Sequence, residues 1–482
     1  MSSTDQHSTG QNGEKHTARV IGVTVAAAVG GFLFGFDSSV VNGAVDAIQG
    51  DFALSDFVVG FAVAVALLGS AVGAWFAGQL ADKIGRKKVM LIGAVLFLAS
   101  AFGAGLAESV PSLLIWRIIG GLGIGIASVI APAYIAEIAP ARFRGALAST
   151  QQLAITLGIF AALLSDALLQ DAAGGAAEQL WLGLAAWRWM FLVGAVPAVV
   201  YGLLSLAIPE SPRYLVAKDL DEEAARVLSR VTGEEHPAAR IKEIRITLRR
   251  ESKSSFRDVL GPSGGLHPLV WVGIGLAALQ QLVGINAIFY YSTTLWRSVG
   301  FTEDQSFTTS VITSVINVVM TFVAILFVDR LGRRRLLLSG SAGMFVGLLL
   351  ACVAFTQQQG TGDAVTLPGS WGVVALVGAN LFVICFAATW GPIMWVMLGE
   401  MFPNRMRAVA LGLCTAVNWV ANFAVSLLFP ALARSIGLGW IYGGFAFFAL
   451  ASFVFVRSLV PETKGMELED MQGSTNRTRA AG

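Results

Sequence analysis

Charged residues are scarce in this chain of 482 residues, because Asp, Glu, Lys and Arg together make up only 13% of it. A soluble domain carries about 25% charged residues, so the composition argues against one. Hydrophobic residues instead make up 55% of the chain, and the mean hydropathy is +0.69. The net charge of +2 gives no sign of a nucleic-acid partner. The composition instead predicts a protein embedded in the lipid bilayer.

Cysteine is also rare, and its positions argue against two kinds of stabilising site. Cys352, Cys385 and Cys414 all lie inside apolar stretches, where a free thiol packs as a small hydrophobe. Their spacing gives neither a disulfide framework nor a set of metal ligands. We therefore expect no metal site.

Histidine is missing from the apolar stretches. The four histidines lie in polar segments of the chain: His7, His16, His236 and His267. This placement argues against a histidine proton relay within a membrane. Any proton chemistry there has to use carboxylates.

No enzymatic constellation is recognisable either. The sequence shows no set of nucleophile, base and orienting group, and its glycines lie in apolar segments rather than after a strand, where a phosphate-binding loop needs them. We expect neither an enzyme nor a bound cofactor.

Long apolar runs are abundant. A helix needs about 20 apolar residues to cross a hydrocarbon layer of about 30 Å. Twelve runs of about this length cover residues 20–45, 58–77, 89–106, 113–132, 147–169, 189–208, 269–296, 308–328, 336–355, 371–398, 408–432 and 439–460. The polar residues before the first run lack the order of a cleavable signal, so we expect this run to remain as a helix.

A basic turn occurs twice, once in each half of the chain. The first copy contains Asp82-Lys83-Ile84-Gly85-Arg86, and the second contains Asp329-Arg330-Leu331-Gly332-Arg333. Each copy follows the second apolar run of its half, which indicates two related membrane halves in tandem. Duplicated halves are typical of secondary transporters, which bind their substrate between the repeats.

Lysine and arginine favour alternate loops, and cytoplasmic loops hold an excess of them. One set of loops is basic, with Lys83, Arg86, Lys87, Lys88, Arg142, Arg144, Arg330, Arg333, Arg334, Arg335, Arg405 and Arg407. The other set is acidic or neutral, with Asp46, Asp51, Asp56, Glu108, Asp171, Glu178, Glu303, Asp304 and Asp363. We therefore expect a multi-pass protein of the cell membrane with both termini in the cytoplasm.

One long polar segment separates the two halves. Within it Ile241, Ile244 and Leu248 recur at helical spacing, which predicts a short amphipathic helix. We expect a cytoplasmic N-tail, a six-helix bundle, a cytoplasmic helical linker, a second six-helix bundle and a cytoplasmic C-tail, over residues 1–19, 20–208, 209–267, 268–460 and 461–482.

Short motifs stand at the ends of several runs. They are Gly85-Arg86-Lys87-Lys88, Pro132-Ala133-Tyr134-Ile135-Ala136-Glu137, Arg142-Phe143-Arg144-Gly145, Pro209-Glu210-Ser211-Pro212-Arg213, Gln280-Gln281-Leu282-Val283-Gly284-Ile285-Asn286, Gly391-Pro392-Ile393-Met394-Trp395, Glu400-Met401-Phe402-Pro403 and Pro461-Glu462-Thr463-Lys464-Gly465. In this order they resemble the sugar porter family of the major facilitator superfamily, over residues 20–465.

The resemblance implies a fold and a function. The fold is the all-α major facilitator fold, with twelve transmembrane helices in two six-helix bundles related by a pseudo-two-fold axis along the membrane normal. The function is proton-coupled symport of a monosaccharide, such as the hexose glucose, into a bacterial cell by alternating access. The partners are then the sugar, protons and the bilayer, and we expect the monomer to function.

The repeated turns suggest a gate. An acid such as Asp82 beside guanidinium groups at a helix end can form an ion pair in one conformation and lose it in another. The resemblance implies a cytoplasmic charge network that holds the outward-facing state, formed by Asp82, Arg86, Glu137, Arg144, Asp329, Arg333, Glu400 and Arg407. The alternative is that these charges only set the topology.

Asp37 lies inside the first run, where an ionised carboxylate costs several kcal/mol unless it is paired or protonated. Arg117, deep in the fourth run, is the obvious partner. The carboxylate can keep the ion pair or accept a proton and release the arginine, which makes the pair a candidate proton switch. By resemblance, an acid here is typical of proton-coupled porters, whereas uniporters commonly have an amide. A purely structural salt bridge is the alternative.

Sugar recognition needs groups that hydrogen-bond hydroxyls and rings that cover apolar C–H faces. Amides and a phenol stand inside apolar runs at Gln152, Gln280, Gln281, Asn286, Tyr290, Asn317 and Asn418. Rings are available at Phe34, Trp395 and Trp419. By resemblance these ten residues form the sugar pocket, although any single amide could instead make a packing hydrogen bond.

An unbroken helix would not bring Gln280 and Asn286 to one face, so we expect a distortion near Gly284 and another near Gly391-Pro392. Val283 departs from the family pattern, because glucose-selective members often have a serine at this position. The sugar is therefore left open, and a polyol such as myo-inositol, a uniporter and a non-transporting membrane sugar sensor are alternatives.

Overall fold

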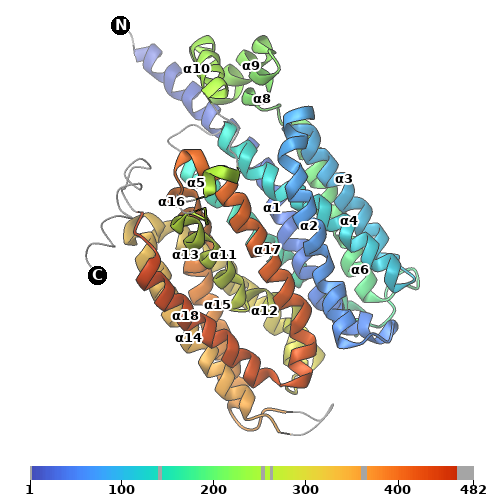
Figure 1. Cartoon of the computed structure of the whole chain (residues 1–482). Helices are drawn as coiled ribbons and strands as arrows, with labels where there is room; N and C mark the ends of the chain where they lie inside the picture. The colour runs from blue at the N-terminus through green and yellow to red at the C-terminus, as the bar shows by residue number, and fades with distance from the viewer. Residues whose placement is uncertain (1–2, 139–143, 251–255, 261–263, 360–365, 464–482) are drawn as a thin grey trace. The chain divides into compact units, whose positions relative to one another are not determined.

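The computed structural model describes residues 3–138, 144–250, 256–260, 264–359 and 366–463 as an almost entirely helical protein (Figure 1). Within these residues, β pairing is limited to three isolated bridges. Twelve helical segments are long and apolar enough to cross a membrane. The twelve predicted spans and the all-α fold class are thus confirmed.

The first six spans consist mostly of single helices. The helices of this half are α1 (Ser3–Asp51), α2 (Asp56–Ile84), α3 (Arg86–Gly105), α4 (Val110–Ile138), α5 (Arg144–Ala173), α6 (Ala186–Val193) and α7 (Ala195–Ala207). The last two together form the sixth span, which covers Ala186–Ala207.

The polar segment after α7 contains short helices, and the second half again contains long ones. The short helices are α8 (Pro212–Ala217), α9 (Asp221–Val227), η2 (Leu228–Thr232), α10 (Pro237–Arg250) and η3 (Phe256–Val259). The second half contains α11 (Pro268–Leu282), α12 (Ile285–Arg297), α13 (Glu303–Leu331), α14 (Arg333–Thr356), α15 (Trp371–Cys385), η5 (Phe386–Trp390), α16 (Gly391–Met401), α17 (Asn404–Ser435) and α18 (Leu438–Leu459).

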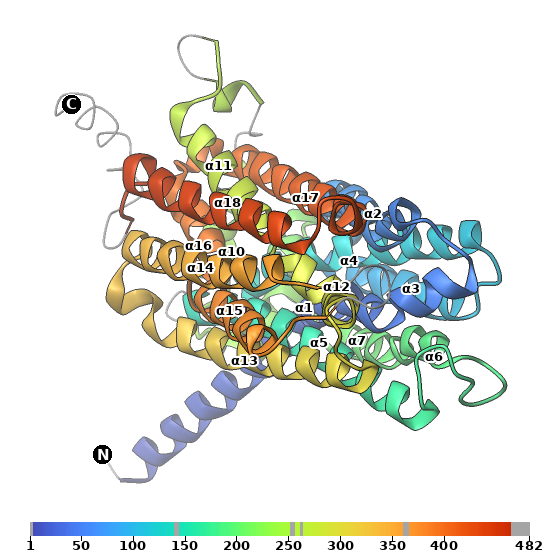
Figure 2. The same ribbon diagram turned by 90° about the horizontal axis from the view of Figure 1, so that it is seen from below.

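The chain packs into two compact units. Unit 1 contains residues 1–38, 65–162 and 188–252, and unit 2 contains residues 39–64, 163–187 and 253–482. In unit 1, α3 packs against α4 and α7, and in unit 2, α14 packs against α15 and α18 (Figures 1 and 2). The units do not coincide with the two sequence halves, since the ends of α1, α2 and α5 belong to unit 2.

Glycine allows helices to approach within backbone contact. A Cβ atom added at Gly121 or Gly125 of α4 would lie 2.1 Å from a backbone oxygen of α2. Small residues at such interfaces let helices in lipid gain dispersion contacts over their backbones. The many glycines of the apolar runs are thus explained in part by packing.

The short helices after α7 have a small core of their own. Ile241 of α10 packs with Leu215 and Leu228, and Ile244 and Leu248 lie against the same cluster. The predicted amphipathic helix is therefore confirmed as α10. Tyr134 of α4 donates a hydrogen bond to the carbonyl of Pro209 at 2.6 Å, which ties the start of this segment to the fourth span.

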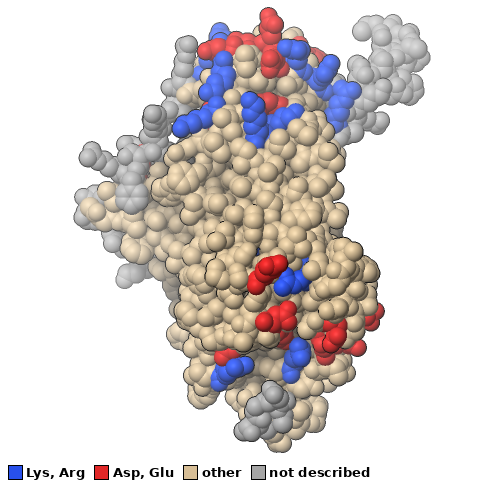
Figure 3. Space-filling model, turned by 90° about the vertical axis from the view of Figure 1, so that its right-hand side faces the viewer, with Lys and Arg blue, Asp and Glu red and all other residues tan. Residues whose placement is uncertain are grey.

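Charged side chains are unevenly distributed over the surface of the protein. On the face shown in Figure 3, Lys and Arg gather with some acids at one end, and a wide band without charged side chains follows. Such a band is expected where helices contact hydrocarbon, because an unpaired charge there is costly.

Candidate functional site

Asp37 and Arg117 form a buried ion pair in unit 1. Asp37 lies on α1 and Arg117 on α4, and Arg117 Nη1 donates a hydrogen bond to Asp37 Oδ1 at 2.8 Å. Their side chains are only 8% and 3% exposed, respectively. The structure therefore brings together the two residues that the sequence predicts to couple transport to protons.

The surroundings of this pair leave it able to switch. Arg117 Nε is buried and has no hydrogen-bond partner among the described residues, while the ring of Phe191 lies 5.7 Å from the guanidinium carbon. A carboxyl group in such apolar surroundings is stable either paired or protonated. Proton binding at Asp37 would therefore release a guanidinium that has unused donors.

The sequence prediction misses a second buried acid. Asp166 on α5 is 0% exposed, and among the described residues neither carboxylate oxygen has a side-chain hydrogen-bond partner. Asp166 packs against α1, where a Cβ atom on Gly43 would lie 2.8 Å from Oδ2. An acid inside an apolar run is a functional candidate by default, but Asp166 lies only three residues from the end of its predicted run at 147–169, where an acid can also reach the interface.

Four of the predicted sugar ligands form one hydrogen-bonded amide cluster in unit 2, composed of Gln280, Gln281, Asn286 and Asn418. Gln281 Nε2 donates to Asn418 Oδ1 at 3.0 Å, and Asn286 Nδ2 donates to Gln281 Oε1 at 2.6 Å. Asn418 Nδ2 donates to Gln280 Oε1 at 2.9 Å. The amide cluster joins α11, α12 and α17, and it contains donors and acceptors of the kind that sugar hydroxyls bind.

The helix break predicted near Gly284 shapes this cluster. Helix α11 ends at Leu282 and α12 begins at Ile285, while Gly284 has a φ angle of 85°. Glycine adopts this left-handed conformation without a steric penalty, whereas a side chain would also collide with the ring of Phe445. The break allows Asn286 to reach back to Gln281.

The second predicted distortion is also present. A π-helical turn, η5, ends at Trp390, and α16 begins at Gly391. Gln280 Nε2 donates to the carbonyl oxygen of Trp390 at 3.0 Å. Both helix distortions therefore meet at the amide cluster, as is common at functional sites in membrane helices.

The other predicted sugar ligands of unit 2 occupy different surroundings. Tyr290 is buried, and its hydroxyl accepts a hydrogen bond from Asn422 Nδ2 at 3.4 Å. Asn317 on α13 is buried, Trp419 is half-buried, and Trp395 is 39% exposed. The four side chains therefore range from buried to exposed.

Two predicted sugar ligands belong to unit 1. Phe34 of α1 packs against the core of this unit, and Gln152 of α5 is half-buried.

The first basic turn forms a tight charge network in unit 1. Arg86 donates two hydrogen bonds to Glu137, from Nε at 3.1 Å and from Nη2 at 2.9 Å. Asp82 lies 3.0 Å from Arg86 Nη1, and Ser211 Oγ also donates to Glu137. Glu210 accepts hydrogen bonds from the backbone N–H groups that begin α3, which suits a carboxylate at a helix N-terminus.

The second basic turn repeats this arrangement in unit 2. Arg333 donates to Glu400 from Nε at 3.1 Å and from Nη2 at 2.9 Å. Thr463 Oγ1 donates to Glu400 at 2.6 Å, and Glu462 accepts from the backbone N–H of Arg333 at 3.0 Å. The two halves thus carry matching networks, which supports the internal repeat.

The predicted gate contains neither Glu210 nor Glu462, although both residues stand in sequence motifs, Pro-Glu-Ser and Pro-Glu-Thr, at the ends of the two halves. Arg407 donates to the carbonyl of Phe402 at 3.1 Å rather than to Glu400, and burial lowers the pKa of its guanidinium. The side chains of Arg144 and Asp329 lie outside the part that the structure describes.

First-half and second-half helices contact each other within unit 2, at the end that carries the acidic loops. Thr293 of α12 donates to Asn42 of α1, from its backbone N–H at 3.0 Å and from Oγ1 at 2.8 Å. Arg297 and Asp46 form an ion pair at 3.0 Å one turn further along. These contacts hold the ends of the two helices together.

Comparison with known proteins gives a consistent result. The family model described as "Sugar (and other) transporter" matches residues 23–474. The chain is 52% identical to a glucose transport protein of a Synechocystis strain, over 94% of this chain and 97% of that protein. It is 36% identical to an arabinose-proton symporter of Bacillus subtilis, over 94% of each chain.

Solved structures of sugar transporters resemble this chain as well. An inward-open conformation of the xylose transporter XylE from E. coli superposes with a TM-score of 0.80 at 32% identity. The match covers 94% of this chain and 99% of that one. Sequence and structure thus resemble the same group of proteins over nearly their whole length.

Proposed function

We propose, on the premise that the chain belongs to the sugar porter family of the major facilitator superfamily, that it imports a hexose together with a proton. It is a multi-pass membrane transporter rather than an enzyme. Relatives named as a glucose transport protein and as sugar-proton symporters support this substrate pair.

The observation that carries proton coupling is the buried ion pair between Asp37 and Arg117. Asp37 accepts the proton, and Arg117 stabilises the ionised form of the acid between proton-binding events. Sugar together with a protonated Asp37 permits the conformational step of alternating access, whereas either one alone permits it poorly. This requirement links the two fluxes.

We assign sugar binding to the ten residues that the sequence predicts, with the amide cluster as their best-supported part. Its amides sit at two helix breaks, where side chains and freed backbone groups can both face a ligand. The charge networks around Glu137 and Glu400 are proposed as the gate. Trp395 and Phe34 are proposed to cover the apolar faces of the ring.

The orientation and organisation are part of the same proposal. The basic turns and the linker at 209–267 face the cytoplasm, the bundles cover 20–208 and 268–460, and both termini are cytoplasmic in a bacterial cell membrane. The monomer is proposed to be the working unit, because each chain carries both halves of the fold.

The decisive experiment follows protons and sugar together. Purified protein in proteoliposomes is placed in a weakly buffered external medium, and glucose is then added. We expect the external medium to become alkaline at an initial rate proportional to sugar uptake, because each sugar takes a proton with it. Sugar flux without proton movement would assign facilitated diffusion instead.

Substitution of the amide cluster should affect sugar binding far more than stability. Gln281→Ala or Asn286→Ala leaves a sugar hydroxyl without its partner, at a cost of about 1–3 kcal/mol, or about fivefold to more than a hundredfold in affinity. Glucose affinity and thermal stability are measured on the same preparations.

A matched control is Asn380→Ala, an amide on α15 that bonds to Thr313 and the carbonyl of Leu376 outside the amide cluster. We expect this variant to keep wild-type affinity. Unchanged affinity in both cluster variants would place the sugar elsewhere.

A further inference from the structure

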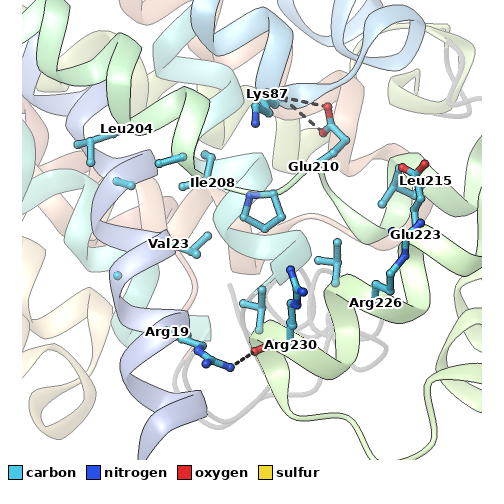
Figure 4. A pocket seen from close by; sticks show the side chains of 16 residues that line it. Arg19, Val23, Lys87, Leu204, Ile208, Glu210, Leu215, Glu223, Arg226 and Arg230 are labelled. Atoms are coloured by element: carbon cyan, nitrogen blue, oxygen red, sulfur yellow. Dashed lines mark hydrogen bonds between the residues drawn. The ribbon is translucent and has the colours of Figure 1, made fainter.

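A cavity of about 840 Å³ lies in unit 1, separate from the ion pair and the amide cluster. Four basic side chains line it from different elements: Arg19 of α1, Lys87 of α3, Arg226 of α9 and Arg230 of η2. Figure 4 shows these side chains around the cavity. Membrane-spanning helices and the short helices after α7 therefore both contribute positive charge to this cavity.

The positive charge in the cavity is only partly neutralised. Arg19 donates to the carbonyl of Arg230 at 3.1 Å, and Lys87 Nζ donates to the carbonyl of Leu206 at 2.6 Å. Arg226 Nε likewise donates to a backbone carbonyl. Carbonyl groups carry no net charge, and within the described residues no carboxylate forms a salt bridge with Arg19, Lys87 or Arg226.

Two acids also line the cavity, Glu210 and Glu223. Glu210 is engaged by the backbone N–H groups at the start of α3, where the positive end of the helix dipole offsets its charge. Four basic and two acidic side chains leave the cavity with a positive excess. A ligand that suits it is anionic.

Most of the remaining cavity wall is apolar, and it comes both from the membrane half and from the short helices, which contribute Leu215, Val227 and Val231. Val23 of α1, with Leu204 and Ile208 at the end of the sixth span, lines the side opposite Arg226 and Arg230 (Figure 4). On α7, where the carbonyl of Leu206 accepts from Lys87, the side chains of Leu203 and Leu206 are 61% and 53% exposed. A surface for an acyl chain thus adjoins the basic groups.

We propose that this cavity binds the headgroup of an anionic phospholipid. Arg19, Arg226 and Lys87 bind the phosphate, with guanidinium groups suited to its oxygens. The acyl chains lie along the exposed apolar face of α7. The bound lipid links the short helices after α7 to the first span.

The apolar neighbours decide between two sources of phosphate. A soluble phosphate compound would use the basic groups alone, whereas a phospholipid also covers Leu203 and Leu206. Basic residues at the boundary of a membrane span attract anionic lipids, and the attraction weakens with salt. We therefore commit to the lipid.

The test titrates full-length protein in detergent with dioleoylphosphatidylglycerol, dioleoylphosphatidylcholine or glycerol 3-phosphate, and counts bound molecules by native mass spectrometry. Wild-type protein is expected to bind the anionic lipid at least tenfold more tightly than the zwitterionic one. The variant Arg19→Gln/Arg226→Gln should lose about thirtyfold for the anionic lipid, or about 1 kcal/mol for each charge removed.

The matched control is Lys218→Gln/Lys242→Gln, which removes two exposed charges from the same polar segment outside the cavity. It should keep wild-type binding. Equal affinity for the two lipids, or an equal loss in both double variants, would overturn the proposal. Displacement of the lipid by glycerol 3-phosphate at equal concentration would do so as well, because the ligand would then be a soluble anion.

Discussion

Asp37→Asn is expected to abolish sugar accumulation while leaving sugar exchange across the membrane intact. The amide is close to the carboxyl in size and can still accept a hydrogen bond from Arg117, but it cannot bind or release a proton. In the wild type, a potential of about 100 mV supplies about 2.3 kcal/mol per proton, which is enough for about fiftyfold accumulation. In the variant the ratio of internal to external sugar should fall to one.

The measurement compares sugar accumulation and counterflow in proteoliposomes with an imposed potential. Asp56→Asn is a suitable control, because Asp56 also pairs with an arginine, Arg434, but at a position where that arginine is 74% exposed. Exposed pairs of this kind contribute about 0–1 kcal/mol, so the control should accumulate sugar normally.

Full accumulation in Asp37→Asn would contradict the assignment and direct attention to Asp166. Among the described residues of the first-half spans, Asp166 is the other acid that is fully buried. The double variant Asp37→Asn/Asp166→Asn then tests whether the proton acceptor lies on α5 instead.

The number of membrane-spanning helices follows from the lipid environment. In lipid every backbone group has to be satisfied within its own segment, so long apolar runs become helices and their number can be counted in the sequence. The twelve spans were predictable for this reason. Gly284 also predicted the helix break correctly, because glycine adopts the left-handed backbone conformation of such a break without a steric penalty.

The partners of individual side chains were less predictable. Glu210 and Glu462 complete the two charge networks from positions far along the chain from Arg86 and Arg333, and only the folded helix ends bring them together. The sequence therefore shows both motifs, but it does not show that their glutamates contact the helix starts at Arg86 and Arg333.

The same limit explains Asp166 and Arg407. Asp166 stands near the end of an apolar run, where the sequence cannot distinguish a snorkelling acid from a buried one, because burial depends on the approach of α1 at Gly43. Arg407 was expected in the charge network that includes Glu400, but it bonds to a carbonyl close to the start of its own helix. Resemblance to a family indicates residue types, whereas packing decides which partner each one has.

Arg117→Leu is expected to uncouple transport even though Asp37 is intact. The substitution leaves the carboxyl buried with no cation to stabilise its ionised form, and breaking a buried pair in this way costs about 3–5 kcal/mol. Asp37 can avoid this cost only by keeping its proton, so it no longer releases one during the cycle. Accumulation should be lost and thermal stability should fall, and most of the stability should return in Asp37→Asn/Arg117→Leu, which removes the unpaired acid.

Arg117→Lys separates charge from geometry at the same position. Lysine supplies the positive charge but lacks the planar guanidinium, and its shorter reach to Asp37 Oδ1 should preserve only part of the accumulation. Arg297→Leu serves as the control, because its pair with Asp46 is 43% exposed on the arginine side and should affect coupling little. The measurement is sugar accumulation against external pH in all four proteins. The two Arg117 variants should differ from the wild type and from each other, and superimposable profiles would remove Arg117 from the proton site.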